Sequence, residues 1–320
     1  MIKAELEIIR LSEVESKPVD WLWYPYIPYG KLTMIQGDPG GGKTMLILHL
    51  AGLLSSGYPL PFDDENSERE PIVVIYQTSE DGYDDTIKPR LESFSRANLD
   101  NIIFINEEKC SLTMLDERIE EAIVRENARL FILDPIQAYV GNGVDINRAN
   151  EVRPLLKNLS QIAQRNNCAI ILIGHMNKDR GSKSSYRNLG SIDFPAACRS
   201  VLICGEMKGE NGIRAVAQDK CSLAPNGKPF AFELSQENGF KWIGYYDITA
   251  EEVLGGMLHK SQKNNAIDFI ETMLSNGPVA SADIFSKAEQ HGIAKRTLDS
   301  AKAELGVTSY KKGNIWYWKL

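Results

Sequence analysis

The stretch Gly37-Asp-Pro-Gly-Gly-Gly-Lys-Thr44 decides the fold class of this 320-residue chain, because it fits the pattern G-x-x-x-x-G-K-[ST]. An apolar run at residues 31–36 predicts a strand before it, and residues 43–55 predict a helix after it. In such a unit the glycines let backbone N–H groups face phosphates, the lysine reaches the terminal phosphates, and the threonine binds Mg²⁺. The sequence therefore predicts a site for a nucleoside triphosphate.

The contacts to this nucleotide are expected from one unbroken run and from one carboxylate further along the chain. The run comprises Gly37, Asp38, Pro39, Gly40, Gly41, Gly42, Lys43, Thr44 and Met45. The carboxylate should end an apolar strand, and Leu130-Phe-Ile-Leu-Asp134 supplies it. Thr44 and Asp134 are therefore the expected magnesium-side residues, while an Asp before a proline is also a common start of a turn.

The region from Lys31 to about Tyr245 alternates short apolar runs with helical stretches, which predicts an α/β fold with a mainly parallel sheet flanked by helices. The predicted strands are 31–36, 72–76, 102–105, 130–133 and 169–173, and the predicted helices are 43–55, 82–96, 115–125 and 150–166. Shorter β runs follow at 201–204, 213–217, 229–233 and 241–245. They predict an antiparallel extension of the same sheet.

The C-terminal part has a different pattern. Helical stretches at 263–275, 281–291 and 294–305 precede two short β runs around the turn Lys311-Lys312-Gly313-Asn314. Three helices followed by a hairpin is the order of a winged helix. We therefore expect an ATPase domain at 1–245, a linker at 246–262 and a winged-helix-like domain at 263–320.

Composition excludes several classes of protein. Hydrophobic residues make up 43% and charged residues 25%, which is typical of globular proteins and not of disordered or fibrous ones. The five cysteines form no C-x-x-C pair, and no basic-then-apolar leader is present, so we expect reduced thiols and a cytoplasmic location. The apolar stretch 45–54 is far shorter than the roughly 20 residues of a membrane span, so no membrane partner is expected.

The charge is unevenly distributed. The net charge is −7, and residues 261–320 carry eight Lys and Arg against six Asp and Glu, which gives +2 there and −9 in the rest. The whole molecule should therefore repel nucleic acid. Any contact with DNA must be local.

Two other classes of phosphate-binding protein compete with an ATPase. The segment Asn177-Lys178-Asp179 is close to the guanine-reading pattern N-K-x-D, but its Asp comes one residue early, and Gln137 stands where a GTPase has Gly. Guanine specificity is unsupported, so ATP is the expected nucleotide. Small-molecule kinases remain open, although they do not explain the segment Tyr76-Gln-Thr-Ser-Glu-Asp81.

This segment closes the second predicted strand and brings carboxylates beside the phosphate site. A hydrolase needs a group that orients the attacking water, and Glu80 is the best candidate. The alternative is a cluster of helix caps, because Ser79 and Asp81 are both good N-caps for the helix that follows.

Together these residues resemble RecA-like ATPases of the plasmid and phage RepA helicase type, which are distant relatives of DnaB. The resemblance runs from Val19 to about Phe232. The segments that carry it are Trp21-Leu-Trp-Tyr-Pro-Tyr-Ile-Pro-Tyr-Gly30, Ser79-Glu-Asp81, Asp134-Pro-Ile-Gln137, Asn147-Arg-Ala-Asn-Glu-Val-Arg153 and Gly174-His-Met-Asn-Lys178. The last one is similar to the family's H-H-x-x-K, with a Gly in place of the first His.

The resemblance implies further roles. His175 would sense the γ-phosphate, Arg199 would be an arginine finger that reaches the neighbouring subunit's phosphates, and Lys220 would be a second cation acting in trans. The alternatives are a strand-end histidine bonded to backbone, and surface or salt-bridge roles for the two cations. A finger in trans implies a homo-oligomer, as a ring with six nucleotide sites between its subunits.

Two loops would face the pore of such a ring and bind single-stranded DNA: residues 141–150 and 177–193. The second loop carries Lys178, Arg180, Lys183 and Arg187 against Asp179 and Asp193, with Tyr186 as its single aromatic. An ordinary solvated loop is the alternative.

In the tail, the expected phosphate contacts are Lys295, Arg296, Thr297 and Lys302, with Lys311 and Lys312 at the tip of the wing. We expect Trp316 and Trp318 in the wing's core. A net charge of +2 is weak for a protein that binds a duplex, so contact with a protein and a purely structural role remain open for this unit.

The leading hypothesis is an oligomeric RecA-like ATPase that acts as a DNA helicase or single-strand translocase in plasmid, phage or mobile-element replication, with replication proteins as further partners. The alternative is an ATP-gated DNA-binding regulator or loader without unwinding activity.

Overall fold

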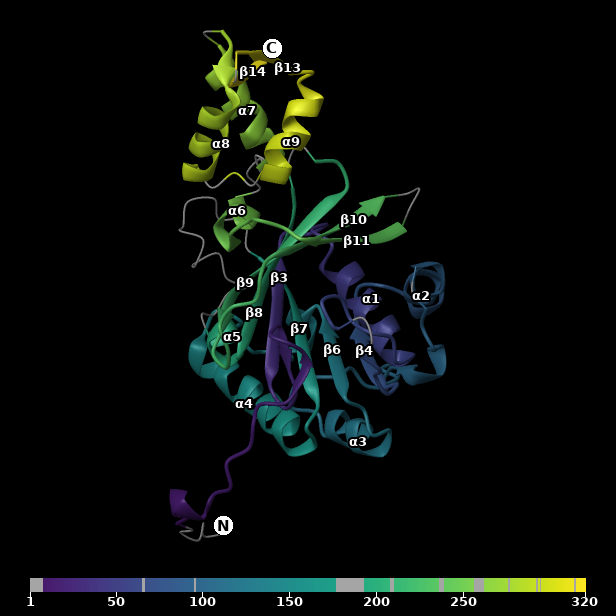
Figure 1. The fold of residues 1–320 in the computed structure, drawn as a ribbon. Helices are drawn as coiled ribbons and strands as arrows, with labels where there is room; N and C mark the ends of the chain where they lie inside the picture. Colours follow the sequence, from purple (N-terminus) through teal and green to yellow (C-terminus); the bar gives the residue numbers. More distant parts are fainter. Residues whose placement is uncertain are drawn as a thin grey trace.

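One large sheet lies at the centre of the protein in this computed structural model (Figure 1). The structure describes residues 8–64, 67–94, 96–176, 193–207, 210–235, 239–255, 262–275, 277–291, 293, 295–313 and 315–320. The sheet order is β11-β10-β9-β8-β3-β7-β6-β4-β5. Its strands are β3 (Leu32–Gly37), β4 (Val74–Thr78), β5 (Ile102–Ile103), β6 (Leu130–Asp134), β7 (Ala169–His175), β8 (Ser200–Glu206), β9 (Ile213–Cys221), β10 (Phe230–Ser235) and β11 (Gly239–Tyr245).

The pairing of the strands confirms the predicted fold class. The strands from β8 to β5 pair in parallel, and β9, β10 and β11 continue the sheet in antiparallel fashion. Strand β7 lies between β3 and β6. The carboxyl ends of β3, β7 and β6 therefore meet at one edge of the sheet, where the phosphate loop follows β3.

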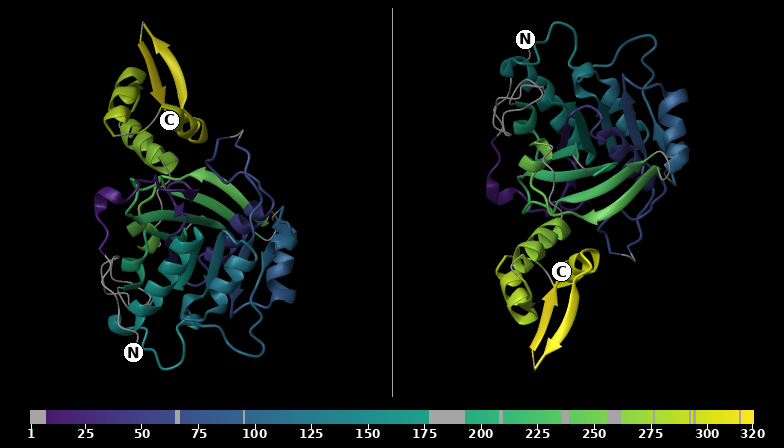
Figure 2. Two further views of the ribbon diagram at one scale, coloured as in Figure 1. Left: turned by 90° about the horizontal axis from the view of Figure 1, so that it is seen from below. Right: turned by 90° about the horizontal axis from the view of Figure 1, so that it is seen from above.

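Helices cover both faces of the sheet (Figures 1 and 2). Helices α1 (Lys43–Ser55) and α2 (Lys88–Phe94) pack on one face, after a π-helical turn at Tyr83–Ile87. Helices α3 (Arg118–Arg125) and α4 (Ala149–Asn166) pack on the other. Successive side chains of a strand point to opposite faces of the sheet, and both faces carry apolar residues that must be buried. In β3, Met34 belongs to the hydrophobic core on one face and Ile35 to the core on the other. No helix in the described ranges is long and apolar enough to span a membrane.

The aromatic segment before the phosphate loop folds as a hairpin of β1 (Trp21–Trp23) and β2 (Ile27–Pro28). Trp23 and Tyr26 are buried against Phe230 of β10, with ring centroids 5.3 Å apart in both pairs. The hairpin therefore anchors the antiparallel extension. The sequence pattern did not predict these strands, because their partners lie about 200 residues away.

Part of the predicted linker is helical. Helix α6 (Ala250–Gly255) packs on β8 and β9, and its buried Val253 lies against Gly205. A short helix, α5 (Asp193–Ala197), precedes β8. Residues 250–255 thus belong to the packed core rather than to a free connector.

The C-terminal unit has its own hydrophobic core, which includes Ile270, Leu298 and Trp318. Its elements are α7 (Gln262–Leu274), β12 (Val279–Ala280), α8 (Ser281–Gln290), α9 (Lys295–Glu304), β13 (Thr308–Lys312) and β14 (Ile315–Lys319). The predicted three helices and hairpin are present, and the winged-helix interpretation stays a prediction. Trp318 is buried, but the prediction that Trp316 is a core residue is wrong, because its side chain is 52% exposed.

Candidate nucleotide-binding site

The phosphate loop connects β3 to α1 and lies directly against the neighbouring strand β8. A side chain at Gly37 would overlap the carbonyl oxygen of Cys204, so only glycine fits there. The Sγ of Cys204 donates to the Gly41 carbonyl at 3.1 Å. Gly42 caps α1 with a φ of 90°, which favours glycine. The close packing fixes the path of the backbone, whose N–H groups and helix N-terminus are the phosphate ligands of such loops.

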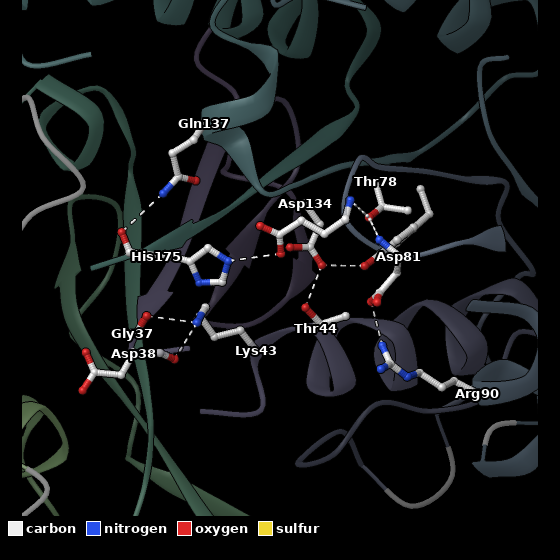
Figure 3. Close-up of polar contacts among 12 residues, drawn as sticks. Gly37, Asp38, Lys43, Thr44, Thr78, Asp81, Arg90, Asp134, Gln137 and His175 are labelled. Atoms are coloured by element: carbon white, nitrogen blue, oxygen red, sulfur yellow. Dashed lines mark hydrogen bonds and ion pairs between the residues drawn. The ribbon is translucent and has the colours of Figure 1, made fainter. Parts of the chain in front are cut away.

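Lys43 is the first residue of α1, and its side chain folds back into the loop. Its Nζ donates to the carbonyls of Gly37 and Asp38, both at 2.9 Å (Figure 3). The residue is 3% exposed, and this burial lowers the pKa of the ammonium group below its ordinary value. The ammonium group is thus held within the loop by two backbone carbonyls, which phosphate oxygens could replace as its acceptors.

Asp134 ends β6 and lies beside Thr44 (Figure 3). Its Oδ2 accepts from the Thr44 hydroxyl at 2.7 Å and from the Tyr76 hydroxyl at 2.6 Å. Burial raises the pKa of Asp134 above its ordinary value, and the two hydrogen bonds oppose that rise. Burial also raises the pKa of Tyr76 well above its usual range, so this hydroxyl remains a donor.

The residues at this edge fit a magnesium nucleotide. Mg²⁺ prefers oxygen ligands and is commonly held by one or two protein groups, with waters and phosphates completing its shell. Thr44 and Asp134 offer a hydroxyl and a carboxylate that already converge. The glycine loop and Lys43 lie next to this pair and would hold the phosphates.

His175 lies between the phosphate loop and Asp134, because β7 lies between β3 and β6. Its Nε2 is 3.4 Å from Oε2 of Glu80. Its Nδ1 is buried with no hydrogen-bond partner among the described residues. The ring therefore faces Glu80, which differs from the alternative of a histidine bonded to backbone.

Glu80 follows β4 and keeps its side chain largely in solvent. Ser79 and Asp81 do not cap the helical turn at Tyr83–Ile87, because its N-cap is Gly82 and no side chain forms a cap bond there. Thr78 Oγ1 accepts from the N–H groups of Glu80 at 3.3 Å and of Asp81 at 3.4 Å, which closes a local turn. Asp81 pairs with Arg90 of α2 at 2.8 Å. The carboxylate of Glu80 is thus left facing the nucleotide edge.

Two polar residues at this edge were not singled out as site residues from the sequence. Tyr76 reaches Asp134, and Gln137 donates through Nε2 to the His175 carbonyl at 3.4 Å. The signal for Tyr76 was present, since a tyrosine two residues before the end of a buried strand must find a polar partner. Gln137 was noted in the segment Asp134-Pro-Ile-Gln137, but its contact with His175 depends on a strand 38 residues away along the chain.

Arg199 and Lys220 lie at the opposite end of the sheet. Arg199 comes directly before β8, and its backbone N–H donates to the Leu32 carbonyl at the start of β3. The side chain is exposed and has no partner in the part of the chain that the structure describes. Lys220 differs, because its Nζ donates to the carbonyls of Pro195 at 2.9 Å, Ala196 at 3.2 Å and Cys198 at 2.8 Å.

The three carbonyls lie at the end of α5, and together they accept from all three N–H groups of the Lys220 ammonium group. Lys220 therefore has a structural contact within its own chain, where the sequence suggested a cation acting in trans. Most of the loop 177–193, with Lys178, Arg180, Lys183, Tyr186 and Arg187, lies outside the described residues. Its last residue, Asp193, belongs to α5 and pairs with Arg153 at 3.1 Å.

Two known proteins are similar to parts of this chain. The chain is 28% identical to the DNA repair protein RadA of Streptococcus pneumoniae (strain ATCC BAA-255 / R6) over 153 residues, which are 47% of this chain and 31% of RadA. It thus spans about a third of that relative's length. The crystal structure of the RadB recombinase aligns with a TM-score of 0.45 and 18% identity, over 68% of this chain and 92% of RadB.

The AAA domain family matches residues 2–181, which is more than half of the chain. The match includes the phosphate loop, Glu80, Asp134 and His175. The chain therefore belongs to the AAA domain family, and its core is that of a RecA-like P-loop ATPase.

Proposed function

We propose that this protein hydrolyses ATP to move along single-stranded DNA, as a helicase or translocase of plasmid, phage or mobile-element replication. The observation that carries the ATPase part is the convergence of Thr44 and Asp134, 2.7 Å apart, next to the buried Lys43. Glu80 and His175 face the same edge, 3.4 Å apart.

Each of these residues has a chemical task in this proposal. Lys43 transfers its hydrogen bonds from the Gly37 and Asp38 carbonyls to phosphate oxygens. Thr44 and Asp134 would hold Mg²⁺, which would offset the negative charge of the phosphates. Glu80 orients the attacking water and accepts its proton. His175 senses the γ-phosphate through its contact with Glu80.

The position of Arg199 supports hydrolysis between subunits. Arg199 lies beside Leu32, which is five residue steps from Gly37 along the extended strand β3, a distance of about 16 Å. The side chain therefore cannot reach its own phosphate loop. It is free to contact a neighbouring copy, and a head-to-tail contact of this kind can close into a ring. We propose six subunits.

The N-terminal segment also supports self-association. Residues 8–20 expose the apolar side chains Ile8, Ile9, Leu11, Val14 and Val19. Such a cluster on an extended segment is typical of a contact with another chain. The magnesium nucleotide would then bind between subunits, close to a neighbour's Arg199.

DNA as the partner is supported by the name of one relative, a DNA repair protein. The alternative of an ATP-gated regulator or loader is favoured by the separate C-terminal unit with its own core. The two proposals predict different responses: the ATPase of a translocase is stimulated by single-stranded DNA, and that of a regulator by duplex DNA.

The test measures ATP turnover without DNA, with single-stranded DNA and with duplex DNA. It then measures strand displacement from a forked substrate. We expect single-stranded DNA to stimulate turnover severalfold and the fork to be unwound. Lys43→Ala, which lacks the phosphate-binding ammonium group, should abolish both. Stimulation by duplex alone, without unwinding, would support the regulator and overturn the translocase.

A further inference from the structure

The hairpin formed by β13 and β14 is the most basic element of the C-terminal unit. Residues 308–319 contain Lys311, Lys312 and Lys319 and no Asp or Glu, in a chain with a net charge of −7. Lys302 of α9 lies beside the hairpin, with its Nζ donating to the Ser309 hydroxyl at 2.7 Å. Four ammonium groups therefore gather on and next to one hairpin without a carboxylate on it.

An exposed tryptophan lies among these lysines. Trp316 pairs across the strands with Lys311, and its side chain is 52% exposed. Trp318 lies two residues along β14 on the same face, where it is 3% exposed and packs edge-on against Phe285 at 5.4 Å. Trp316 thus lies on the same face of β14 as the buried Trp318, but at the end of the strand that the helices leave exposed.

The opposite face of the hairpin repeats this combination of aromatic and basic groups. Tyr310 and Tyr317 stack across the strands with centroids 5.8 Å apart, and Lys312 pairs with the exposed Ile315. Figure 2 shows the hairpin projecting from the helices of the C-terminal unit. Both faces near its turn are accessible to a partner.

We propose that this hairpin is a single-stranded DNA-binding site, with Trp316 stacked on an unpaired base, Lys311 of the same face on one flanking phosphate, and Lys312, on the opposite face beside the turn, on the next phosphate. Flat aromatic rings bordered by cations bind single strands, because bases supply the stacking faces and phosphates the negative charge. A duplex keeps its bases stacked on one another and would leave Trp316 exposed. An acidic protein surface would form ion pairs with the lysines, but it would leave the flat ring of Trp316 without a stacking partner.

The site deepens the proposed translocase function, since it gives the motor a second contact with its strand outside the ATPase core. The site binds DNA without ATP, because it belongs to a unit with its own hydrophobic core. Binding can therefore be measured on the full chain in the absence of nucleotide, independently of turnover.

The test uses a thymidylate oligonucleotide of about 15 nucleotides, within the range that single-strand-binding folds cover. Trp316→Ala should weaken binding about tenfold, because the stacking of one base on an aromatic ring is lost, while Trp316→Phe should keep most of the affinity. Tyr24→Ala is the matched control, because Tyr24 is a similarly exposed aromatic residue that lies outside the C-terminal unit. It should bind as the unmodified protein does.

The lysines are tested through the salt dependence of binding. Lys311→Gln with Lys312→Gln should reduce the slope of log K against log salt by about 1.4, because each phosphate contact to a single strand contributes about 0.7. Lys17→Gln with Lys241→Gln removes the same charge from exposed positions elsewhere and should leave the slope unchanged.

A second measurement locates the base on the unmodified protein. An oligonucleotide with 5-iodouracil should cross-link to the peptide that contains Trp316. Cross-links confined to other peptides, an unchanged affinity of Trp316→Ala, or equal binding of a duplex would overturn the site. If single-stranded DNA stimulates ATP turnover while the cross-link misses Trp316, only this site fails. If the cross-link is found and turnover does not respond, only the translocase fails.

Discussion

At the scale of single residues, Asp134 shows that function and stability oppose one another in this site. Its carboxylate is 4% exposed and has two neutral donors, Thr44 and Tyr76, with no cation bonded to it among the described residues. Burial raises its pKa, so the folded protein holds the proton more tightly than the unfolded chain does. The free energy of unfolding therefore falls as pH rises from the unfolded to the folded pKa, and it stays lower above both.

We predict that Asp134→Asn stabilises the protein at neutral pH while abolishing ATP turnover. The amide oxygen can still accept from Thr44 and Tyr76, but the buried charge is gone. The melting temperature should rise by a few degrees, which is about 1 kcal/mol for a domain of this size. Thermal unfolding between pH 8 and pH 4.5, without Mg²⁺ or nucleotide, measures the difference.

The difference should shrink as pH falls, because the carboxyl of the unmodified protein then becomes neutral as well. Mg²⁺ with ATP should reverse the order, since it stabilises only the chain that binds it. An Asn variant that is less stable than the unmodified protein at pH 8 would show that the charge at Asp134 is well compensated.

At the scale of elements, the phosphate loop depends on its contact with β8. We predict that Gly37→Ala destabilises the protein by about 3 kcal/mol, because the new methyl group meets the backbone carbonyl of Cys204, which cannot rotate away. Gly40→Ala should cost only about 1 kcal/mol, since its φ of 76° disfavours alanine but no atom lies within 4 Å of the new group. Urea unfolding curves of the two variants compare them, and equal losses would refute the packing argument.

The sequence predicted those elements whose residues carry the signal themselves. Helix α1 has the predicted ends, 43 and 55, because the loop glycines stop β3 and the apolar run that follows reaches Ser55. Asp134 was found at the end of β6 for the same reason, as the first charged residue after four apolar ones. The strands of the antiparallel extension were found in order, each within a few residues.

The features that were missed depend on distant partners. Strands β1 and β2 exist because Trp23 and Tyr26 pack against Phe230 of β10. Trp316 was placed in the core by the alternation of β14, although no helix covers that end of the strand. Such contacts are not encoded in any local window of sequence.

At the scale of the whole molecule, the central claim is that each site needs two copies of the chain. Lys43 and Arg199 belong to opposite ends of the sheet, so one copy cannot bring both to one nucleotide. In a head-to-tail assembly the Lys43 of one subunit meets the Arg199 of the next. Lys43→Ala and Arg199→Ala should each reduce turnover by about 10³-fold or more.

Mixing these two inactive variants tests the claim most directly. In an equal mixture, about a quarter of the contacts join an intact Lys43 to an intact Arg199, because the two changes lie on different sides of the interface. The account predicts that ATP turnover returns on mixing, at up to about a quarter of the unmodified rate. A mixture no more active than its separate components, or an Arg199→Ala protein with full activity by itself, would contradict it.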